Sequence, residues 1–208
     1  MTRILYLHGF ASGPRSSKAR YFRDRLMQAG ARVEIPDLAA GDFEHLTIKG
    51  QLGVMENLAG GEEVSLIGSS LGGYLAALYA ARHPEVRRVV LLAPGFAFGR
   101  RWPEWLGTQR MEEWRRNGTM EVFHYAENRN CRLAYELIED AARYEDEPDF
   151  QQPCRIFHGS KDDVVPARLS EAFAASRPNV RLEIVESGHE LLNVLEEIGA
   201  EVERFLLS

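Results

Sequence analysis

Short runs rich in Leu and β-branched residues alternate along this chain with longer segments whose apolar residues recur at helical spacing. Such alternation is typical of a parallel sheet that is covered on both faces by helices. Strands are predicted at Arg3 to Leu7, Arg32 to Ile35, Val64 to Ile67, Arg88 to Leu92, Cys154 to Phe157 and Arg181 to Val185. Helices are predicted at Ser17 to Ala29, Leu46 to Asn57, Leu71 to Arg82, Ala167 to Ala175 and Glu190 to Leu206. The pattern predicts an α/β fold with a mostly parallel, six-stranded, doubly wound sheet.

The segment from Gly95 to Gln152 interrupts this alternation, because it is long, rich in Trp, Arg and Glu, and has no clear strand. Segments of this size inside a compact domain often act as lids or binding elements. We therefore expect one domain over residues 1–208, with residues 95–152 as a helical lid. A plain helical cover for the edge of the sheet is the alternative.

Composition narrows the class of protein. The 208 residues suffice for one buried core, and a net charge of −6 disfavours a nucleic-acid or anionic-membrane partner. The two cysteines, Cys131 and Cys154, are spaced neither as metal ligands nor as a redox pair. No apolar stretch is long enough to span a bilayer. We expect a soluble cytoplasmic protein that uses no metal or cofactor; the oligomeric state stays open.

The hexapeptide Gly68-Ser69-Ser70-Leu71-Gly72-Gly73 lies between a predicted strand and a predicted helix. It fits the nucleophile elbow G-x-S-x-G when the two glycines are Gly68 and Gly72, which makes Ser70 the candidate nucleophile. Glycine at both positions lets the strand and helix backbones approach each other. A phosphate-binding loop is the alternative, but it takes a lysine after its last glycine or G-x-G-x-x-G spacing, and Tyr74 stands there instead.

A nucleophilic serine needs a histidine base that is oriented by a carboxylate, in the chain order serine, acid, histidine. His189 follows the last predicted strand after Gly188 and is the candidate base. His158, at the end of the preceding strand, is instead expected to satisfy backbone groups. The loop between them holds two adjacent carboxylates, Asp162 and Asp163. One of the two has an ordinary alternative role as a charge near a helix N-terminus, and we favour Asp162 as the acid.

An oxyanion hole usually consists of two backbone N–H groups that face the developing negative charge. Leu71, directly after Ser70, would supply one, and Phe10 in the turn after the first strand would supply the other. Trp102 and Trp105 of the insertion are the candidate substrate-binding residues, because the insertion leaves the sheet at the edge where Ser70 lies.

With these motifs in place, the chain resembles the α/β-hydrolase superfamily, and within it the small bacterial YqiA/YcfP-type esterases. The resemblance rests on Tyr6-Leu7-His8-Gly9-Phe10, Ser16-Ser17-Lys18-Ala19, Gly68 through Gly73, His158-Gly159 through Pro166, and Gly188-His189-Glu190-Leu191. The insertion and the acid loop are also similar to those of abhydrolase-type palmitoyl-protein thioesterases. The resemblance implies a serine-ester hydrolase with Ser70, Asp162 and His189 as its triad. One departure from the family pattern is expected, because the chain begins at what that pattern would place as the third strand, without the leading antiparallel strands of larger members.

We therefore expect a serine hydrolase that cleaves a small-molecule carboxylic ester through an acyl-enzyme on Ser70. Cleavage of a thioester or of a carbon–carbon bond by the same triad is one alternative, because a fold does not fix its substrate. A catalytically idle binding module that keeps the fold is another. Neither the physiological substrate nor its acyl length can be predicted.

Overall fold

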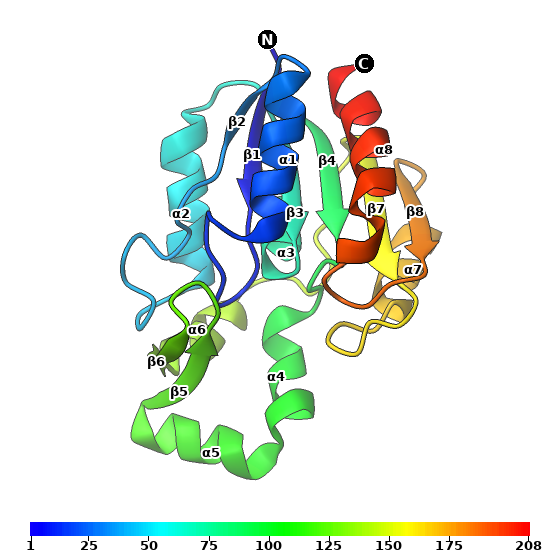
Figure 1. The fold of residues 1–208 in the computed structure, drawn as a ribbon. Coiled ribbons are helices and arrows are strands. Elements are labelled where there is room, and N and C mark those ends of the chain that lie inside the picture. Colours follow the sequence, from blue (N-terminus) through cyan, green and yellow to red (C-terminus); the bar gives the residue numbers. More distant parts are fainter.

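A six-stranded sheet forms the centre of the computed structural model, which describes residues 1–208 (Figure 1). Its strands are β1 (Arg3–Leu7), β2 (Arg32–Glu34), β3 (Val64–Ser69), β4 (Val86–Leu92), β7 (Cys154–Gly159) and β8 (Val180–Val185). They lie in the order β2-β1-β3-β4-β7-β8, and every neighbouring pair is parallel. From β1 the chain adds β2 on one side of the sheet, and from β3 it adds β4, β7 and β8 on the other side. Loops after two such strands diverge and leave a crevice in which ligands bind.

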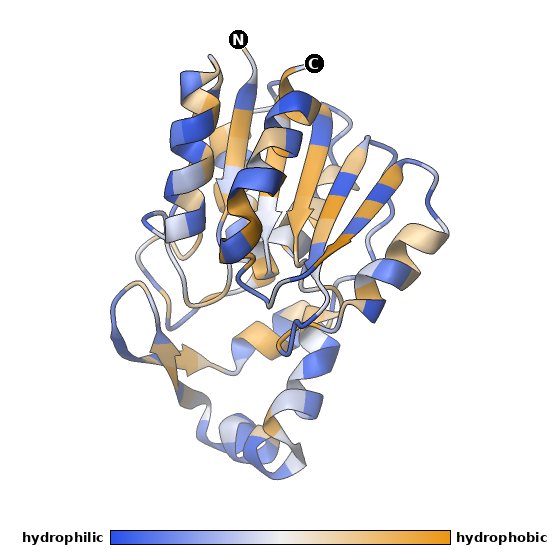
Figure 2. Cartoon of the chain, turned by 45° about the vertical axis from the view of Figure 1, so that its right-hand side comes forward, coloured by the Kyte–Doolittle hydropathy of each residue, from blue (hydrophilic) through white to orange (hydrophobic).

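Helices cover both faces of the sheet, as predicted. Helices α1 (Ser17–Gln28) and α8 (Leu195–Leu207) pack on one face, and α2 (Ile48–Ala59), α3 (Leu71–Ala80) and α7 (Arg168–Ala175) pack on the other. Side chains alternate along β1, so that Ile4 and Tyr6 belong to one core and Leu5 and Leu7 to the other. Figure 2 shows the strands of this sheet as largely hydrophobic ribbon. The predicted fold class is confirmed.

Several helix boundaries differ from the prediction for local reasons. Helix α2 begins at Ile48 rather than Leu46, because the Thr47 side chain accepts a hydrogen bond from the Gly50 N–H and caps the helix. The helix predicted from Glu190 begins only at Leu195, after the short 3₁₀ turn η1 (Leu192–Val194). Leu191, with φ +57°, is left-handed and interrupts any earlier helix.

We call residues 95–152 the cap, and its helices and hairpin lie beyond the carboxyl ends of the sheet strands (Figure 1). Its last residues run back beside α3 to the start of β7, where the Gln152 side chain donates to the carbonyls of Ala80 and His83. The cap contains α4 (Phe98–Leu106), α5 (Thr108–Asn117), β5 (Thr119–His124), β6 (Arg129–Ala134) and α6 (Glu136–Ala141). Three helices agree with the expected helical insertion, but the expectation that it holds no strand was wrong, because β5 and β6 form an antiparallel hairpin. Alternate residues of β6, Cys131 and Leu133, are buried in the cap while their neighbours face outward.

A third apolar cluster fills the cap and joins it to the sheet domain. It contains Trp102, Met111, Trp114, Cys131, Leu133 and Leu137 from the cap, and Ala11, Phe43 and Leu46 from loops of the sheet domain. The two candidate tryptophans differ in exposure, since Trp102 is 4% exposed and Trp105 is 69% exposed. None of the helices combines the length and apolar composition needed to cross a membrane.

Candidate active site

Ser70 lies in the sharp turn between β3 and α3, with φ 54° and ψ −119°. A non-glycine residue in so sparsely populated a region costs about 1–3 kcal/mol and persists only where its surroundings enforce it. Here the Ser70 N–H donates to the Leu92 carbonyl at 2.9 Å, and the Ser70 carbonyl accepts from the N–H groups of Gly73 and Gly95 at 2.9 and 2.8 Å. The turn is thus fixed to the end of β4.

The glycines on either side of Ser70 are required by close backbone contacts. A Cβ on Gly68 would lie 2.2 Å from the Gly72 carbonyl oxygen, and a Cβ on Gly72 would lie 2.1 Å from the Leu7 carbonyl oxygen. Both distances fall well inside van der Waals contact with backbone atoms. The spacing of these glycines around Ser70 therefore follows from the geometry of the turn, whereas Ser69 is the buried last residue of β3.

We expect Gly72→Ala to destabilise the protein, because the added methyl group forces the elbow away from β1. Overpacking of this kind costs about 1–3 kcal/mol or more. Gly53→Ala in α2 is the matched control: a Cβ there meets nothing within 4 Å, and alanine is about 1 kcal/mol better than glycine inside a helix. Urea unfolding of both variants checks the prediction, and equal or greater stability of Gly72→Ala would contradict it.

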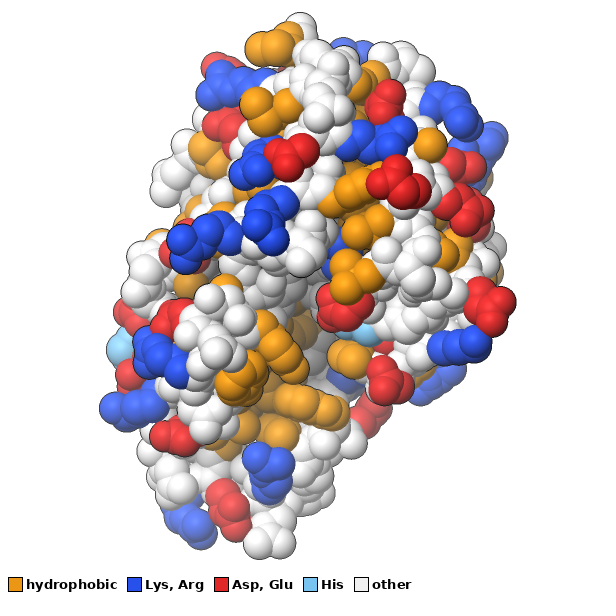
Figure 3. All heavy atoms as spheres, in the orientation of Figure 1, with side chains coloured by type: hydrophobic (Ala, Val, Ile, Leu, Met, Phe, Trp, Pro, Cys, Tyr) orange, Lys and Arg blue, Asp and Glu red, His pale blue; other side chains and the backbone are white.

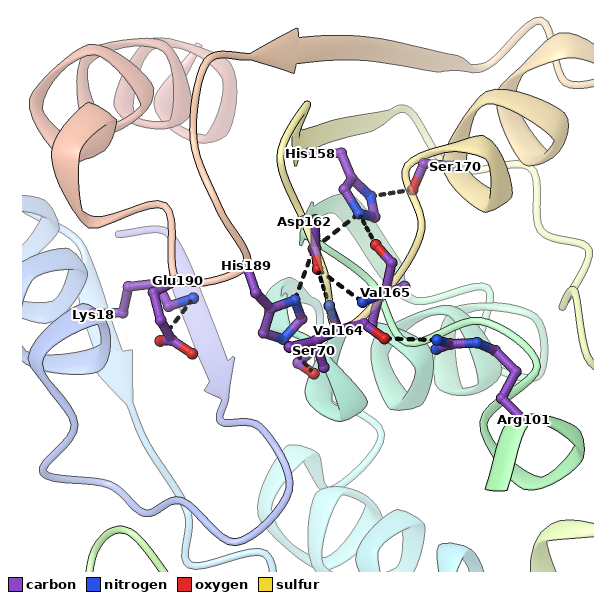
Figure 4. A network of polar contacts seen from close by, with 10 residues as sticks. All are labelled: Lys18, Ser70, Arg101, His158, Asp162, Val164, Val165, Ser170, His189 and Glu190. Carbon is purple, nitrogen blue, oxygen red and sulfur yellow. Dashed lines mark hydrogen bonds and ion pairs between the residues drawn. The ribbon is translucent and has the colours of Figure 1, made fainter. Parts of the chain in front are cut away.

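His189 lies between Ser70 and Asp162 (Figure 4). Its Nε2 is 3.0 Å from Ser70 Oγ, and its Nδ1 is 2.7 Å from Asp162 Oδ2. Because a carboxylate only accepts, Nδ1–H donates to Asp162, which leaves Nε2 to accept the hydroxyl proton of Ser70. The structure thus brings together the three residues that the sequence singled out, from loops after β3, β7 and β8.

The Asp162 carboxylate is fully buried and surrounded by donors. Its Oδ1 accepts from the backbone N–H groups of Val164 and Val165 at 2.9 and 2.7 Å, and its Oδ2 lies 3.1 Å from His158 Nε2. Burial raises the pKa of this carboxyl, but hydrogen bonds from His158, His189 and Val165 outweigh it and bring the pKa well below the ordinary value. Asp162 is therefore ionised at neutral pH, while Asp163 is exposed.

The two backbone N–H groups proposed from the sequence as oxyanion donors, those of Phe10 and Leu71, donate to no acceptor in the protein. The loop that carries Phe10 lies against the elbow, since a Cβ on Gly9 would be 3.3 Å from Ser70 Cβ. Leu71 opens α3, whose N-terminal end favours negative charge. The Phe10 ring packs edge-on against Trp102 at 5.5 Å, so this loop also contacts the cap.

The cap also makes hydrogen bonds to both loops beside Ser70, which sequence reasoning missed. The Tyr125 N–H donates to the Ala11 carbonyl at 2.8 Å, and the Arg101 guanidinium donates to the Val164 carbonyl at 2.6 Å (Figure 4). No motif marks either contact, because both are made to backbone carbonyls. Figure 3 shows a hollow between the cap and the sheet domain, with hydrophobic side chains gathered along its cap side.

Solved structures with this fold are numerous. Est1E from Butyrivibrio proteoclasticus superposes with a TM-score of 0.81 at 21% identity, covering 99% of this chain and 87% of that one. Mouse alpha/beta hydrolase domain-containing protein 10 gives 0.82 at 19% identity, with 99% and 90% covered. A monoacylglycerol lipase from Paleococcus ferrophilus gives 0.76 at 17% identity, with 98% and 93% covered.

At these identities the superpositions establish the fold, which is that of the α/β hydrolases. The sequence itself gives a more specific relationship, because a family profile matches residues 3–205, nearly the whole chain. The chain belongs to the family described as Uncharacterised protein family (UPF0227).

Proposed function

We propose that this protein is a serine hydrolase that cleaves carboxylic esters through an acyl-enzyme on Ser70. The observation that carries the proposal is the hydrogen-bonded series from Ser70 Oγ to His189 Nε2 at 3.0 Å and from His189 Nδ1 to Asp162 Oδ2 at 2.7 Å. Ser70, which is half-buried, lies at one end of this series in a strained turn between strand and helix. A serine, a base and an orienting carboxylate in this geometry are the groups that acyl transfer needs.

In the proposed reaction, Ser70 Oγ attacks the carbonyl carbon of the ester while His189 Nε2 takes the hydroxyl proton. Asp162 keeps the proton of His189 on Nδ1 and stabilises the imidazolium that forms. His189 then returns the proton to the departing alkoxide, and the acyl group stays on Ser70. Water, deprotonated by His189, attacks the acyl-enzyme, and the acid product leaves with the serine hydroxyl restored.

The negative charge on the tetrahedral carbonyl oxygen needs donors that are already in place. We assign this role to the N–H groups of Phe10 and Leu71, which have no other acceptor in the protein. One such donor contributes about 2.7–4 kcal/mol to transition-state stabilisation in related chemistry. The reaction needs no cofactor, because proton transfer and charge stabilisation are both provided by these side chains and backbone groups.

The ester as substrate class is supported by fold relatives such as the monoacylglycerol lipase, whose name states its action on an ester. A panel of 4-nitrophenyl esters of increasing acyl length, beside matched thioesters, tests the proposal on the purified protein. We expect ester hydrolysis that is lost in His189→Ala. Preference for the thioesters would move the substrate class to acyl thioesters, and no turnover of either series would favour an idle binding module.

The cap tryptophans supply the next prediction, since we propose that Trp102 and Trp105 line the acyl-binding side of the hollow. Trp105→Ala should change the ranking of short against medium acyl esters, because each buried methylene contributes about 0.8 kcal/mol. Trp105 is exposed, so the substitution leaves the cap core filled. The ratio of kcat/KM between the butanoyl and octanoyl esters is the measurement.

Met27→Ala is the control for the ranking, because Met27 is also a large exposed apolar residue but lies on α1, away from the cap. Trp102→Ala is expected to change the ranking as well, but it empties a buried site and costs about 3–5 kcal/mol. A folded Trp105→Ala with the wild-type ranking would contradict a substrate-binding role for Trp105.

A further inference from the structure

One fully buried histidine takes no part in the proposed steps. His158, in β7, contacts three groups through its two ring nitrogens (Figure 4). Nε2 lies 2.8 Å from the Val165 carbonyl oxygen and 3.1 Å from Asp162 Oδ2, and Nδ1 lies 2.8 Å from Ser170 Oγ. The sequence predicted the bond to the backbone but gave no sign of the contact with Asp162.

The partners of His158 determine where its proton lies. A carbonyl oxygen and an ionised carboxylate can only accept, so Nε2 must carry a proton that both share. At Nδ1 the Ser170 hydroxyl can donate to the ring, so both ring nitrogens have partners. The opposite tautomer would place the Nε2 lone pair against two acceptors in a buried site, and the cost of such an arrangement excludes it.

Four donors therefore converge on the Asp162 carboxylate. Two backbone N–H groups hold Oδ1, while His189 Nδ1–H and His158 Nε2–H both face Oδ2. The same His158 proton also reaches the Val165 carbonyl, whose own N–H is one of the donors to Oδ1. His158 thereby fixes both the carboxylate and the short loop that wraps around it.

We propose that His158 is a positioning residue for the reaction on Ser70. It keeps Asp162 ionised and turned toward His189, acting through the carboxylate without touching the substrate. The inference rests on the proposed function, in which Asp162 orients His189. A purely structural histidine would contribute to folding but would leave the pH dependence of the reaction unchanged, and this difference makes the proposal testable.

The test compares two substitutions of His158 by polar side chains of different length. The amide nitrogen of His158→Gln can take the place of Nε2 and donate to Asp162. The shorter side chain of His158→Asn can still meet Ser170 but ends too far from Asp162. Ser170→Ala is the matched control, because it disturbs the same buried histidine at Nδ1 and leaves the donor to Asp162 in place.

The readout is the rate constant of covalent labelling of Ser70 by a fluorophosphonate, measured as a function of pH. Loss of a donor makes Asp162 more basic, so it stabilises the imidazolium of His189 more strongly, and the rising limb of the profile moves to higher pH. For His158→Asn we expect this shift together with about tenfold slower labelling on the plateau. His158→Gln and Ser170→Ala should keep the wild-type position of the limb.

A folded His158→Asn with the wild-type profile would overturn the proposal. If His158→Asn fails to fold, histidine ¹⁵N spectra of the wild-type protein decide instead: His158 Nε2 should stay protonated throughout the pH range in which the labelling rate rises, and an unprotonated Nε2 would overturn the proposal. Failure of the proposed function gives a different result, because the wild-type protein would then not be labelled at Ser70 at all.

Discussion

Ser70→Ala is expected to abolish ester hydrolysis, with a loss on the order of 10⁶ in kcat, while the protein stays folded. Alanine removes the attacking oxygen and leaves the elbow backbone free to keep its turn. Ser69→Ala is the matched control, because Ser69 is the neighbouring residue of the same type and is buried at the end of β3. Removal of the Ser69 hydroxyl should leave most of the turnover intact.

Steady-state kinetics on the 4-nitrophenyl ester that the wild type hydrolyses fastest measure both variants, with circular dichroism to verify folding. Comparable turnover in Ser70→Ala would rule out an acyl-enzyme on this residue. If Ser69→Ala loses turnover and Ser70→Ala keeps it, the nucleophile is Ser69. That result would contradict the assignment of Gly68 and Gly72 as the glycines of the elbow, which their close backbone contacts support.

The second large effect is expected at the two adjacent carboxylates. Asp162→Asn should lower kcat by about 10⁴, because an amide in place of the acceptor favours the wrong tautomer of His189. Asp162 is buried against His189 at 2.7 Å, whereas Asp163 is exposed and has no ion pair in the structure. Asp163→Asn should therefore stay within a few-fold of the wild type.

Both variants carry the same change of charge and volume, so their ratio isolates the position of the carboxylate. The measurement is kcat for each on one ester at one pH. A larger loss in Asp163→Asn would transfer the orienting role to the neighbouring residue, and equal small losses would remove the carboxylate from the mechanism.

The sheet could be predicted from sequence because its four inner strands, β1, β3, β4 and β7, are largely buried on both faces. Every residue of β3 is buried, and β4 ends in an apolar run from Val89 to Leu92. The alternation of such segments with helical ones indicates a parallel sheet and leaves few other topologies. Element ends were less predictable, because they depend on single contacts. Helix α8 begins later than predicted because Leu191 has a left-handed backbone conformation, and no local sequence pattern indicates that conformation.

The hairpin of the cap was missed because its strands are only half buried and carry many charges. In β5, Glu121 and Phe123 face outward while His124 is buried, so apolar residues do not mark one side consistently. The strands are specified by packing on Trp114, whose indole N–H donates to the Leu133 carbonyl at 3.0 Å. Tertiary contact of this kind overrides a weak local pattern.

Within the candidate site, residues belonging to chain motifs could be predicted and contacts across the fold could not. The glycine register indicated Ser70, and chain order indicated His189 and the loop that holds Asp162 and Asp163, of which Asp162 was favoured. Nothing in the sequence indicated that His158 also faces Asp162, because the contact depends on how the loop after β7 folds back over that strand. Similarly, only the structure shows Arg101 bonded to Val164, next to the carboxylate.

The most direct test of the account is covalent labelling of the wild-type protein by a fluorophosphonate, with the modified residue located by peptide mass spectrometry. A phosphonate reacts with a serine only when an adjacent base activates it, so the test requires no knowledge of the natural substrate. We predict one adduct per chain, on Ser70, that is lost in Ser70→Ala. An unlabelled wild-type protein, or an adduct on any other residue, would contradict the assignment of Ser70 as the nucleophile.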